Sequence, residues 1–449
     1  MDYSEVRNYI TEKDKMGSVF DMTGITELLK YLGNPEKHIP AVHIAGTNGK
    51  GSIMAYVEQC LISAGLKVGR YISPTIYDYR ERWQINKIWV EAEAVAEAIT
   101  KVAEAEEEMK ADGIRIPTAF EVETAATFLI FKKENVDIML IECGMGGRLD
   151  ATNVLGADTI NVMAAVSRDH MKVLGDTLEE ITSEKLGIVR PGSTLVSYPQ
   201  KPEVINKIRD YSDENYVNLI ETDPTKLNIL SESYRGSHFI YKDEEYIINI
   251  GSGYQILNAI TAIDVLQAIE EKLIPNIEKQ LDMPIHLTKD IIKDGLEKTN
   301  WDGRFSVVSK DPLIIVDGAH NEDAWLRLKE SIDKYFTKTK ITFIIGVLAD
   351  KEYEKMVDIL LPCMGNVFTV KSDNPRALSA EKLANLIQKK AMSESNMSQS
   401  TSSQIFVEAK KDYSDAITSA IEKQKGEPII VFGTLSISGE IIRCIESMQ

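Results

Sequence analysis

The chain has 449 residues, 43% of them hydrophobic and 27% charged, a composition typical of soluble globular proteins and a length that predicts two domains. Its net charge of −18 argues against nucleic acid as a main partner, because a phosphate backbone is bound by basic surface. Its four cysteines are scattered, which predicts no disulfides. Its first ten residues have no apolar core and its apolar runs are too short to span a bilayer, so neither a signal peptide nor a membrane segment is expected. Together these features predict a cytoplasmic protein.

The N-terminal elements lead to the most informative stretch of the chain. Apolar spacing predicts a helix over residues 1–31, which Gly33-Asn34-Pro35 ends. Residues 41–45 predict a buried parallel strand, and residues 53–64 predict a helix. The turn between them consists of Gly46, Thr47, Asn48, Gly49, Lys50, Gly51 and Ser52.

This strand, glycine turn and helix predict a phosphate-binding loop. Glycines have no Cβ, so backbone N–H groups can approach phosphate oxygens, and Lys50 adds a positive charge at the start of a helix. Gly51 separates Lys50 from Ser52, which departs from the usual spacing of such loops. An ordinary glycine-rich turn is the alternative, but the lysine and both flanks favour nucleotide binding.

Polar groups follow the next predicted strand. Residues 67–72 predict that strand, and Ser73 lies at its carboxyl end, where open α/β sheets bind ligands. Residues 77–86 are aromatic, polar and basic, and indicate either a loop that covers a substrate or an ordinary exposed loop. Residues 90–109 predict an acidic helix with a solvated face.

A carboxylate is expected beside the phosphate-binding loop. Thr118 and Glu121 first form the capping box of a helix that extends through Phe131, a structural role that alone explains both residues. Residues 136–141 then predict a strand that brings Glu142 to the sheet edge. Such a carboxylate can hold Mg²⁺, and a solvated glutamate is the alternative. The glycine-rich turn after it adds Arg148, Asp150 and Asn153.

A histidine and a lysine come next. Residues 159–166 predict a strand, and His170 after it is a better ligand candidate than a histidine on a core helix face. A helix is predicted over residues 178–185, ended by Gly187. Because Lys185 lies among several glutamates, local sequence predicts a surface ion pair of small energetic weight.

A second α/β pattern begins after a polar linker at residues 296–304. Its strands are predicted at residues 313–316, 341–347, 367–370 and 428–432. Asp317 and His320 follow the first of these strands, so an ATP site closed between two domains would account for polar groups at both sets of strand ends. Residues 391–404, rich in Ser, Met and Gln, predict a flexible loop.

Taken in order, these motifs resemble the dihydrofolate synthase/folylpolyglutamate synthase branch of the Mur ligase superfamily over nearly the whole chain. The blocks that carry the resemblance are residues 46–52, Tyr71-Ile72-Ser73-Pro74 with Glu81-Arg82, Thr118 to Glu121, Glu142 to Asn153, Asp169-His170 with Glu184-Lys185, Gln255 with Asn258, Gly303-Arg304, Asp317 to Asn321, and Gly433-Thr434-Leu435. The resemblance implies an α/β protein with an N-terminal P-loop ATPase-type domain on a mostly parallel sheet and a smaller C-terminal Rossmann-like domain. Expected bounds are residues 1–298 for the domain with the ATP site and pterin pocket, and 299–449 for the glutamate-ligase domain.

The resemblance also implies an ATP-dependent amide ligase that adds L-glutamate to a folate or pteroate through an acyl phosphate, releasing ADP and phosphate. ATP and Mg²⁺, at two sites, are the expected cofactors, and a cytoplasmic monomer without nucleic acid or membrane partners is expected. By position, the expected catalytic residues are Lys50, Lys185, His320 and Asp317. ATP contacts are expected from residues 46–52, Asn258, Arg304 and Asp317. Expected metal ligands are Ser73, Glu142, His170 and Lys185, the last matching a lysine that superfamily members carbamylate with CO₂. The pterin pocket is expected at Thr118, Phe120, Glu121, Leu149, Asp150 and Ala151.

Three positions depart from the family pattern. Thr75 and Tyr254 replace histidines, and Arg80 replaces an asparagine in the loop expected over the pterin. Substrate choice between dihydropteroate and tetrahydrofolate therefore stays open. Two other functions are considered: a Mur-type ligase that joins an amino acid to a different carboxylic acid, and a nucleotide-binding regulatory protein without turnover.

Overall fold

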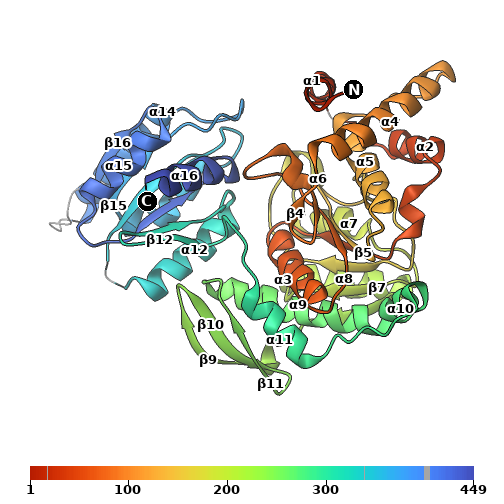
Figure 1. Ribbon diagram of the computed structural model, residues 1–449. Coiled ribbons are helices and arrows are strands. Elements are labelled where there is room, and N and C mark those ends of the chain that lie inside the picture. The colour runs from red at the N-terminus through yellow and green to blue at the C-terminus, as the bar shows by residue number, and fades with distance from the viewer. Residues whose placement is uncertain (18, 338, 399–404, 449) are drawn as a thin grey trace.

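Figure 1 shows the computed structural model, which describes residues 1–17, 19–337, 339–398 and 405–448. The chain forms two lobes, joined by the segment between α11 (Lys289–Lys298) and β12 (Ser306–Lys310). An eight-stranded and a three-stranded sheet belong to the N-terminal lobe, and a six-stranded sheet belongs to the C-terminal lobe. The predicted α/β class is confirmed. The expected division between residues 298 and 299 falls directly after α11, and we propose it as the domain boundary.

The eight-stranded sheet has the order β4-β3-β2-β5-β1-β6-β7-β8. Its strands are β1 (Ala41–Ala45), β2 (Val68–Tyr71), β3 (Trp83–Ile85), β4 (Ile88–Trp89), β5 (Ile138–Glu142), β6 (Ile160–Met163), β7 (Thr194–Ser197) and β8 (Asn218–Glu221). The strands from β2 to β8 in this order are parallel, and β3 and β4 form an antiparallel hairpin at one edge. Ile44 is aligned with Glu142 and with Val162, so the carboxyl ends of β1, β5 and β6 meet at one edge.

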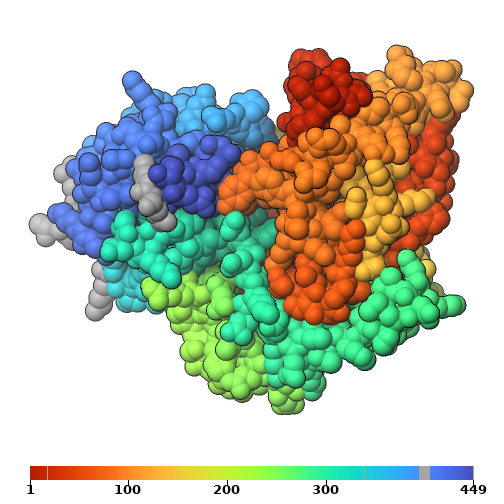
Figure 2. Space-filling view, viewed as in Figure 1, coloured from red at the N-terminus to blue at the C-terminus, as the bar shows by residue number. Residues whose placement is uncertain are grey.

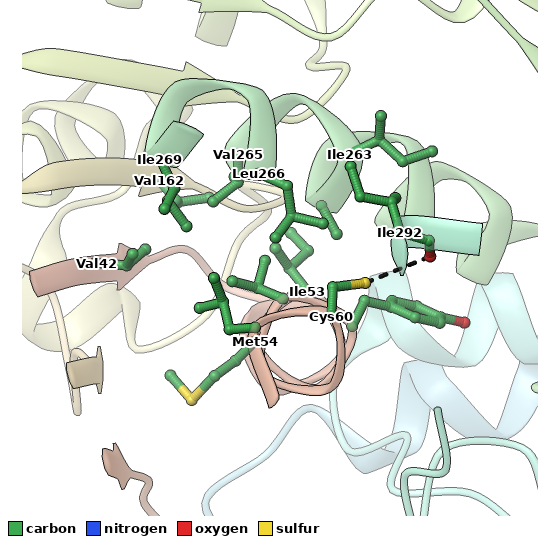
Figure 3. Close-up of a cluster of buried hydrophobic side chains, with 14 of the residues drawn as sticks. Val42, Ile53, Met54, Cys60, Val162, Ile263, Val265, Leu266, Ile269 and Ile292 are labelled. Atoms are coloured by element: carbon green, nitrogen blue, oxygen red, sulfur yellow. Dashed lines mark hydrogen bonds between the residues drawn. The ribbon is translucent and has the colours of Figure 1, made fainter. Parts of the chain in front are cut away.

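Helices cover both faces of this sheet, so its central strands β1 and β5 are buried along their whole length. The helices of the N-terminal lobe are α1 (Tyr3–Asp14), α2 (Thr23–Tyr31), α3 (Lys50–Ser63), α4 (Ala92–Ala111), α5 (Ala119–Lys133), α6 (Met171–Leu174), α7 (Leu178–Leu186), α8 (Pro202–Glu214), α9 (Gly253–Lys272), α10 (Ile274–Leu281) and α11. Val42 and Ile44 face the core formed with α3 and α9, whereas Ala41 faces the core formed with α4 and α5. Figure 3 shows the first core, where the Cys60 thiol of α3 lies 3.5 Å from the Ile292 carbonyl oxygen of α11.

A three-stranded antiparallel sheet extends the core of the N-terminal lobe. It contains β9 (Leu227–Ser233), β10 (Gly236–Tyr241) and β11 (Glu244–Ile248), with β10 in the centre. Burial alternates along β10, and Phe239 and Tyr241 enter the core shared with α3 and α9. This alternation is what a strand with one solvated face requires.

The C-terminal lobe contains a six-stranded sheet with the order β12-β13-β17-β14-β15-β16, parallel except for β12. Its further strands are β13 (Leu313–Val316), β14 (Ile341–Ile345), β15 (Met364–Thr369), β16 (Phe406–Ala409) and β17 (Ile429–Phe432). Its helices are α12 (Glu322–Tyr335), α13 (Tyr353–Leu360), α14 (Ala380–Ser398), α15 (Tyr413–Lys423) and α16 (Leu435–Met448). Two apolar cores lie on its two faces, as the Rossmann-like expectation requires.

Two predicted elements need correction. The single helix expected over residues 1–31 is two helices, because α1 ends before Gly17, whose φ of 77° is left-handed and incompatible with continued helix. The loop predicted at residues 391–404 begins as helix, since α14 continues to Ser398 through residues that include no Gly or Pro. Residues 399–404 lie outside the described residues. Over the described ranges, the helices are too short or too polar to cross a bilayer.

Candidate active site

A cavity of about 670 Å³ is lined by both lobes. Every residue that the sequence predicted to be catalytic, or to bind ATP, metal or the pterin, contributes to its lining. These residues come from the carboxyl ends of β1, β2, β5, β6 and β13, from α3, α5, α7 and α9, and from the segment between the lobes. The structure thus brings the predicted residues to one site, while their individual roles stay predictions.

The phosphate-binding loop connects β1 to α3. Its Thr47 and Asn48 amides donate to the Ala165 carbonyl, at 2.8 and 3.1 Å, which fastens the loop to the segment after β6. Gly49 caps α3 with a φ of 87°, and a Cβ there would lie 2.7 Å from Oδ1 of Asn258. Glycine is therefore required for both conformation and space. The residues at the start of α3 line the cavity, so a phosphate bound there would lie at the positive end of the helix dipole.

Lys50 and Glu142 are neighbours in the lining of the cavity. Nζ of Lys50 lies 3.7 Å from Oε1 of Glu142 and donates to the Gly46 and Thr47 carbonyls, at 3.3 and 3.4 Å. Burial raises the pKa of the Glu142 carboxyl, and Lys50 and Arg304 oppose that rise. The Ser73 amide donates to Oε2 of Glu142 over 3.4 Å, so the ends of β2 and β5 meet here as predicted.

Lys185 is not the surface residue that its local sequence predicted. It lies on the inner face of α7 with Leu178 and Ile181, while Glu179 and Glu180 face solvent. Its side chain is buried, and Nζ donates to the Gly46 carbonyl at 2.9 Å. Burial, followed by repulsion from Lys50, lowers the pKa of the Lys185 amine to about 8.

The donors expected to hold Mg²⁺ are Ser73, Glu142, His170 and Lys185, and all four line the cavity. Among the described residues, there is no group of three or more His, Cys, Asp and Glu side chains placed to enclose a metal ion. Mg²⁺ does not require such a cage, because it keeps several waters and takes one or two carboxylates together with substrate phosphates. Glu142 supplies a carboxylate with one long amide contact, Ser73 a hydroxyl, and His170 an imidazole on the same cavity wall. Burial lowers the pKa of the His170 imidazole, which favours the neutral form that binds metals.

Asp317 connects the two lobes at the other side of the cavity. Its carboxylate accepts hydrogen bonds from the Phe305 and Ala319 amides and from the Tyr254 hydroxyl, each at 2.8 Å. Tyr254 belongs to α9 in the N-terminal lobe, so this bond crosses from one lobe to the other. Arg304, in the same wall, donates to the Gly303 carbonyl at 3.0 Å.

His320 lies beside the same loop. Its Nδ1 lies 2.8 Å from the Gly318 carbonyl and must be the donor, because the carbonyl can only accept. Burial lowers the pKa of His320 to about 4, so the ring is neutral at pH 7 and Nε2 carries a lone pair. Nε2 is 3.8 Å from Oδ2 of Asp169.

The predicted pterin pocket combines apolar surface with anchored carboxylates. The predicted capping box of α5 is confirmed: Thr118 accepts from the Glu121 amide at 3.4 Å, and Glu121 accepts from the Thr118 amide at 2.7 Å. Glu121 also binds Arg115 and the Ile25 amide, so its carboxylate is held by four donors. Asp150 is buried and accepts from the Met145 and Thr152 amides, at 2.8 and 3.0 Å. Phe120, Leu149 and Ala151 supply the apolar surface.

Comparison with known proteins places the chain in a family. A family model described as dihydrofolate synthetase, C-terminal domain, matches residues 302–444. The dihydrofolate synthase/folylpolyglutamate synthase of Bacillus subtilis (strain 168) is 31% identical over 402 residues, which cover 87% of this chain and 91% of the relative. The chain belongs to the dihydrofolate synthase/folylpolyglutamate synthase family. The predicted enzyme class, an ATP-dependent acid–amino-acid ligase, is confirmed with it.

Further members of the family match along the full chain. The folylpolyglutamate synthase of Lacticaseibacillus casei is 29% identical over 454 residues, 98% of each protein. The solved folylpolyglutamate synthase of Thermotoga maritima superposes with a TM-score of 0.81 at 27% identity, covering 100% of this chain and 97% of that one. E. coli FolC, solved in complex with DHPP and ADP, has the same fold, with a TM-score of 0.81 at 24% identity over 99% and 98% of the two chains.

The site also contains residues to which sequence reasoning assigned no role. Lys351 forms an ion pair with Asp169 at 2.5 Å, and both side chains are nearly buried. Asn321 donates to Asp169 at 3.2 Å and to Asn48 of the phosphate-binding loop at 3.0 Å. Asp169 follows a predicted strand and belongs to a block that carries the family resemblance, whereas the only sequence signal for Lys351 was its position after a predicted strand. Their pairing depends on how the lobes meet.

Proposed function

We propose that this protein joins L-glutamate to the carboxyl group of a folate or pteroate, using ATP and forming an acyl phosphate. The observation that carries the proposal is a single cavity with three chemically different walls. The phosphate-binding loop lines it, Phe120 of α5 and Leu149 add aromatic and apolar surface, and cationic side chains come from the C-terminal lobe. The names of the B. subtilis and L. casei relatives support the same substrates.

The N-terminal wall suits a flat heteroaromatic acid. Phe120 offers a half-buried ring, and Leu149 is 41% exposed at the cavity. Asp150, held rigidly by backbone amides, supplies a carboxylate oxygen for the polar edge of a ring. A binding site with mostly apolar walls and a few fixed polar groups orients such a ligand.

The C-terminal wall suits the dicarboxylate. Arg327, Lys351 and Arg376 line this part of the cavity. Of these, Lys351 is the least exposed, with 13% of its side chain accessible, so its charge is the least screened by solvent. We propose that these cations attract glutamate and hold its carboxylates while its amine faces the acid.

With this placement, the reaction has two steps, formation of the acyl phosphate and formation of the amide bond. A carboxylate oxygen of the acid attacks the γ-phosphorus of ATP, the bond from that phosphorus to the β–γ bridging oxygen breaks, and ADP leaves. The glutamate amine then attacks the acyl carbon, the bond from that carbon to the phosphate oxygen breaks, and the nitrogen loses a proton. Lys50 compensates the charge that moves in the first step, and Nε2 of His320 is an acceptor beside the transferred group.

Mg²⁺ would be held by Ser73, Glu142 and His170, and when bound it would neutralise phosphate charge. We further propose that Lys185 is carbamylated. Its neutral amine attacks CO₂, a nitrogen–carbon bond forms, and one proton leaves, so a cation becomes a carboxylate for a second Mg²⁺. The lowered pKa and the buried position beside the phosphate-binding loop support this reaction. By family resemblance, we propose a monomer that acts in the cytoplasm.

The test is incorporation of radiolabelled glutamate with ATP and Mg²⁺, run in parallel on dihydropteroate and tetrahydrofolate. Incorporation on both acids indicates a bifunctional enzyme, and incorporation on tetrahydrofolate alone indicates a chain-extending synthase. Lys50→Ala, which removes the phosphate-loop cation, should abolish both reactions. Incorporation on neither acid by the unmodified protein would contradict the folate proposal and favour a ligase for a different carboxylic acid.

A further inference from the structure

The segment between the lobes contacts two of the loops that border the N-terminal half of the cavity. Residues 299–305 connect α11 to β12. Two consecutive side chains in this segment, Trp301 and Asp302, contact different loops. Trp301 packs on the phosphate-binding loop, and Asp302 binds the loop predicted to cover the substrate.

Trp301 packs directly on Gly51. A Cβ at Gly51 would lie 2.8 Å from Cζ2 of the indole ring and 3.2 Å from Nε1, so no larger residue fits beneath the ring. Gly51 is the residue that separates Lys50 from Ser52, the departure from the usual phosphate-loop spacing. The tryptophan therefore fills the space that this glycine leaves open, one residue from the phosphate-loop lysine.

A buried cation holds the same indole ring. The Arg70 guanidinium carbon is 4.7 Å from the ring centroid. Arg70 is itself buried between Glu58 of α3 and Gln84 of β3, and it donates to both side chains. Because Glu58 and Gly51 belong to the same helix, Trp301 and Arg70 are held against α3 at two points along its length.

The neighbouring residue secures the second loop. Asp302 accepts a hydrogen bond from the Tyr77 hydroxyl at 2.9 Å, and the Tyr77 carbonyl accepts from Arg443 of α16 at 3.4 Å. Figure 2 shows this junction, where the orange surface of the N-terminal lobe meets the dark blue surface of α16. In the structure the loop between β2 and β3 includes residues 73–82, because β3 begins at Trp83. Through Tyr77, this loop is bound to the connecting segment and to the C-terminal lobe.

The connecting segment continues directly into the C-terminal half of the site. The Gly303 carbonyl accepts from the Gly318 amide at 2.7 Å, and the Phe305 amide donates to Asp317 at 2.8 Å. A short path of packing contact, main chain and hydrogen bonds thus runs from Gly51 through Trp301 to the loop that carries Asp317 and His320. These two loops lie on different lobes, and the reaction requires groups from both.

We infer that Trp301 is a positioning residue for phosphoryl transfer. It sets the phosphate-binding loop at a fixed distance from the Asp317–Asn321 loop, so that nucleotide bound by one loop is presented correctly to the other. The inference rests on the proposed function for its kinetic part only. Its structural part is that nucleotide bound at residues 46–52 changes the hydrogen exchange of residues 317–321 through Trp301. This part concerns nucleotide binding and can be tested without turnover.

The test uses the full chain with two substitutions. Trp301→Leu removes the aromatic surface against Gly51 and Arg70. Trp301→Phe keeps an aromatic ring but loses the second ring of the indole, including Nε1–H, which has no hydrogen-bond partner among the described residues. We expect Trp301→Leu to lower kcat by about 100-fold, the cost of a small misplacement of reacting groups, with the Kd for ADP changed by less than about 3-fold. Trp301→Phe should retain kcat within about 5-fold.

The second readout is hydrogen exchange of residues 317–321. ADP should slow this exchange in the unmodified protein and in Trp301→Phe, but not in Trp301→Leu. Trp89→Leu is the matched control, because Trp89 also lies beside an arginine, with Arg80 at 5.9 Å, but does not line the cavity. It should behave like the unmodified protein in both measurements.

The inference is overturned if Trp301→Leu keeps its kcat, or if ADP still slows exchange at residues 317–321 in that variant. If Trp301→Leu fails to fold, Trp301→Phe decides. A kcat loss of about 100-fold in Trp301→Phe, without a matching change in the Kd for ADP, would contradict the role assigned to the aromatic ring. Retained kcat together with retained protection of residues 317–321 would support that role. If the unmodified protein ligates no folate, the proposed function fails, while the exchange measurement still decides for or against Trp301.

Discussion

The Lys185 amine lies where a positive charge is unfavourable. It is buried, it donates to the Gly46 carbonyl, and Lys50 is among the charges that act on it. With a pKa of about 8, roughly a tenth of these amines are neutral at pH 7 and roughly half at pH 8. Only the neutral amine has the lone pair that attacks CO₂. Carbamylation at fixed CO₂ should therefore increase as the pH rises from 7 to 8.5.

We predict that ¹³C-labelled bicarbonate gives a carbamate signal whose intensity follows this pH dependence. Lys185→Ala should lose the signal and lower kcat by at least about 100-fold, because the carboxylate that would neutralise phosphate charge is missing. Added formate or acetate should restore part of the rate by supplying a carboxylate. Lys172→Ala, at an exposed lysine of α6, serves as the control and should keep both the signal and the rate. A Lys185→Ala enzyme with undiminished kcat would contradict the carbamate.

The position of some site residues can be predicted from the sequence for a physical reason. Ser73 and Glu142 lie at the ends of apolar strands of one sheet, and the carboxyl ends of parallel strands meet at one edge, so the sequence predicts that these two residues meet. Asp317 follows an apolar strand of the other sheet, so its position depends on how the lobes meet. Lys185 differs, because its burial depends on how α7 packs against the phosphate-binding loop. Only the family resemblance singled it out. The roles predicted for these residues stay predictions until they are measured.

At the scale of elements, α5 and α7 both begin with a capping box formed by a threonine and a glutamate. Thr118 with Glu121 starts α5 beside the substrate pocket, and Thr177 with Glu180 starts α7 on the surface. In each case the threonine hydroxyl and the glutamate carboxylate satisfy backbone N–H groups that the helix leaves unpaired. The two caps have similar chemistry but different neighbours, so comparing them separates a structural role from a role in substrate binding.

We predict that Thr118→Ala and Thr177→Ala each lower the free energy of unfolding by about 1 kcal/mol, measured by urea denaturation. Only Thr118→Ala should also raise the KM for the acid, because Thr118 lines the cavity and Thr177 does not. Equal KM values in the two variants would remove Thr118 from the substrate pocket and leave it the role of a cap.

Elements were easier to predict than the contacts between them. The strands at β1, β5, β6, β13, β14 and β17 and the helices α5 and α7 follow from apolar spacing and capping residues. The polar composition of residues 391–398 predicts a loop, but α14 extends to Ser398 because those residues have adequate helix propensity. Polar residues remain helical when one stretch of the same helix is anchored in a core, as Leu383 and Ile387 are here.

At the scale of the whole molecule, polar contacts hold the lobes together over the phosphate-binding loop. Lys351 pairs with Asp169, and Asn321 binds both Asp169 and Asn48. Burial would raise the pKa of Asp169, but Lys351 lowers it below its usual range. A carboxyl with a lowered folded-state pKa contributes stability above its unfolded pKa and loses it only as the pH falls through the folded value. The contribution of this pair should thus stay constant between about pH 6 and 8.

We predict that Lys351→Met lowers the free energy of unfolding by about 3 kcal/mol, because Asp169 is left nearly buried without its cation. The double variant with Asp169→Asn should lose less than Lys351→Met alone, since it has no unpaired charge. Lys201→Met is the control: its pair with Asp323 also joins the lobes, but at 4.0 Å with a half-exposed lysine, and should contribute less than about 0.5 kcal/mol. Additive losses in the double variant would show that Asp169 and Lys351 act independently.

The contact between Tyr77 and α16 has a consequence for biosynthesis. The loop at residues 73–82 belongs to the N-terminal lobe, but Arg443 of α16 and the tight approach of Gly439 to the Ile76 carbonyl hold it from the other end of the chain. During translation the N-terminal lobe emerges first and can build its own cores. The wall of the cavity formed by residues 73–82 acquires its C-terminal partners only after the ribosome has made α16. A nascent chain halted before α16 should bind nucleotide at its phosphate-binding loop, but it should not yet hold the acid in place.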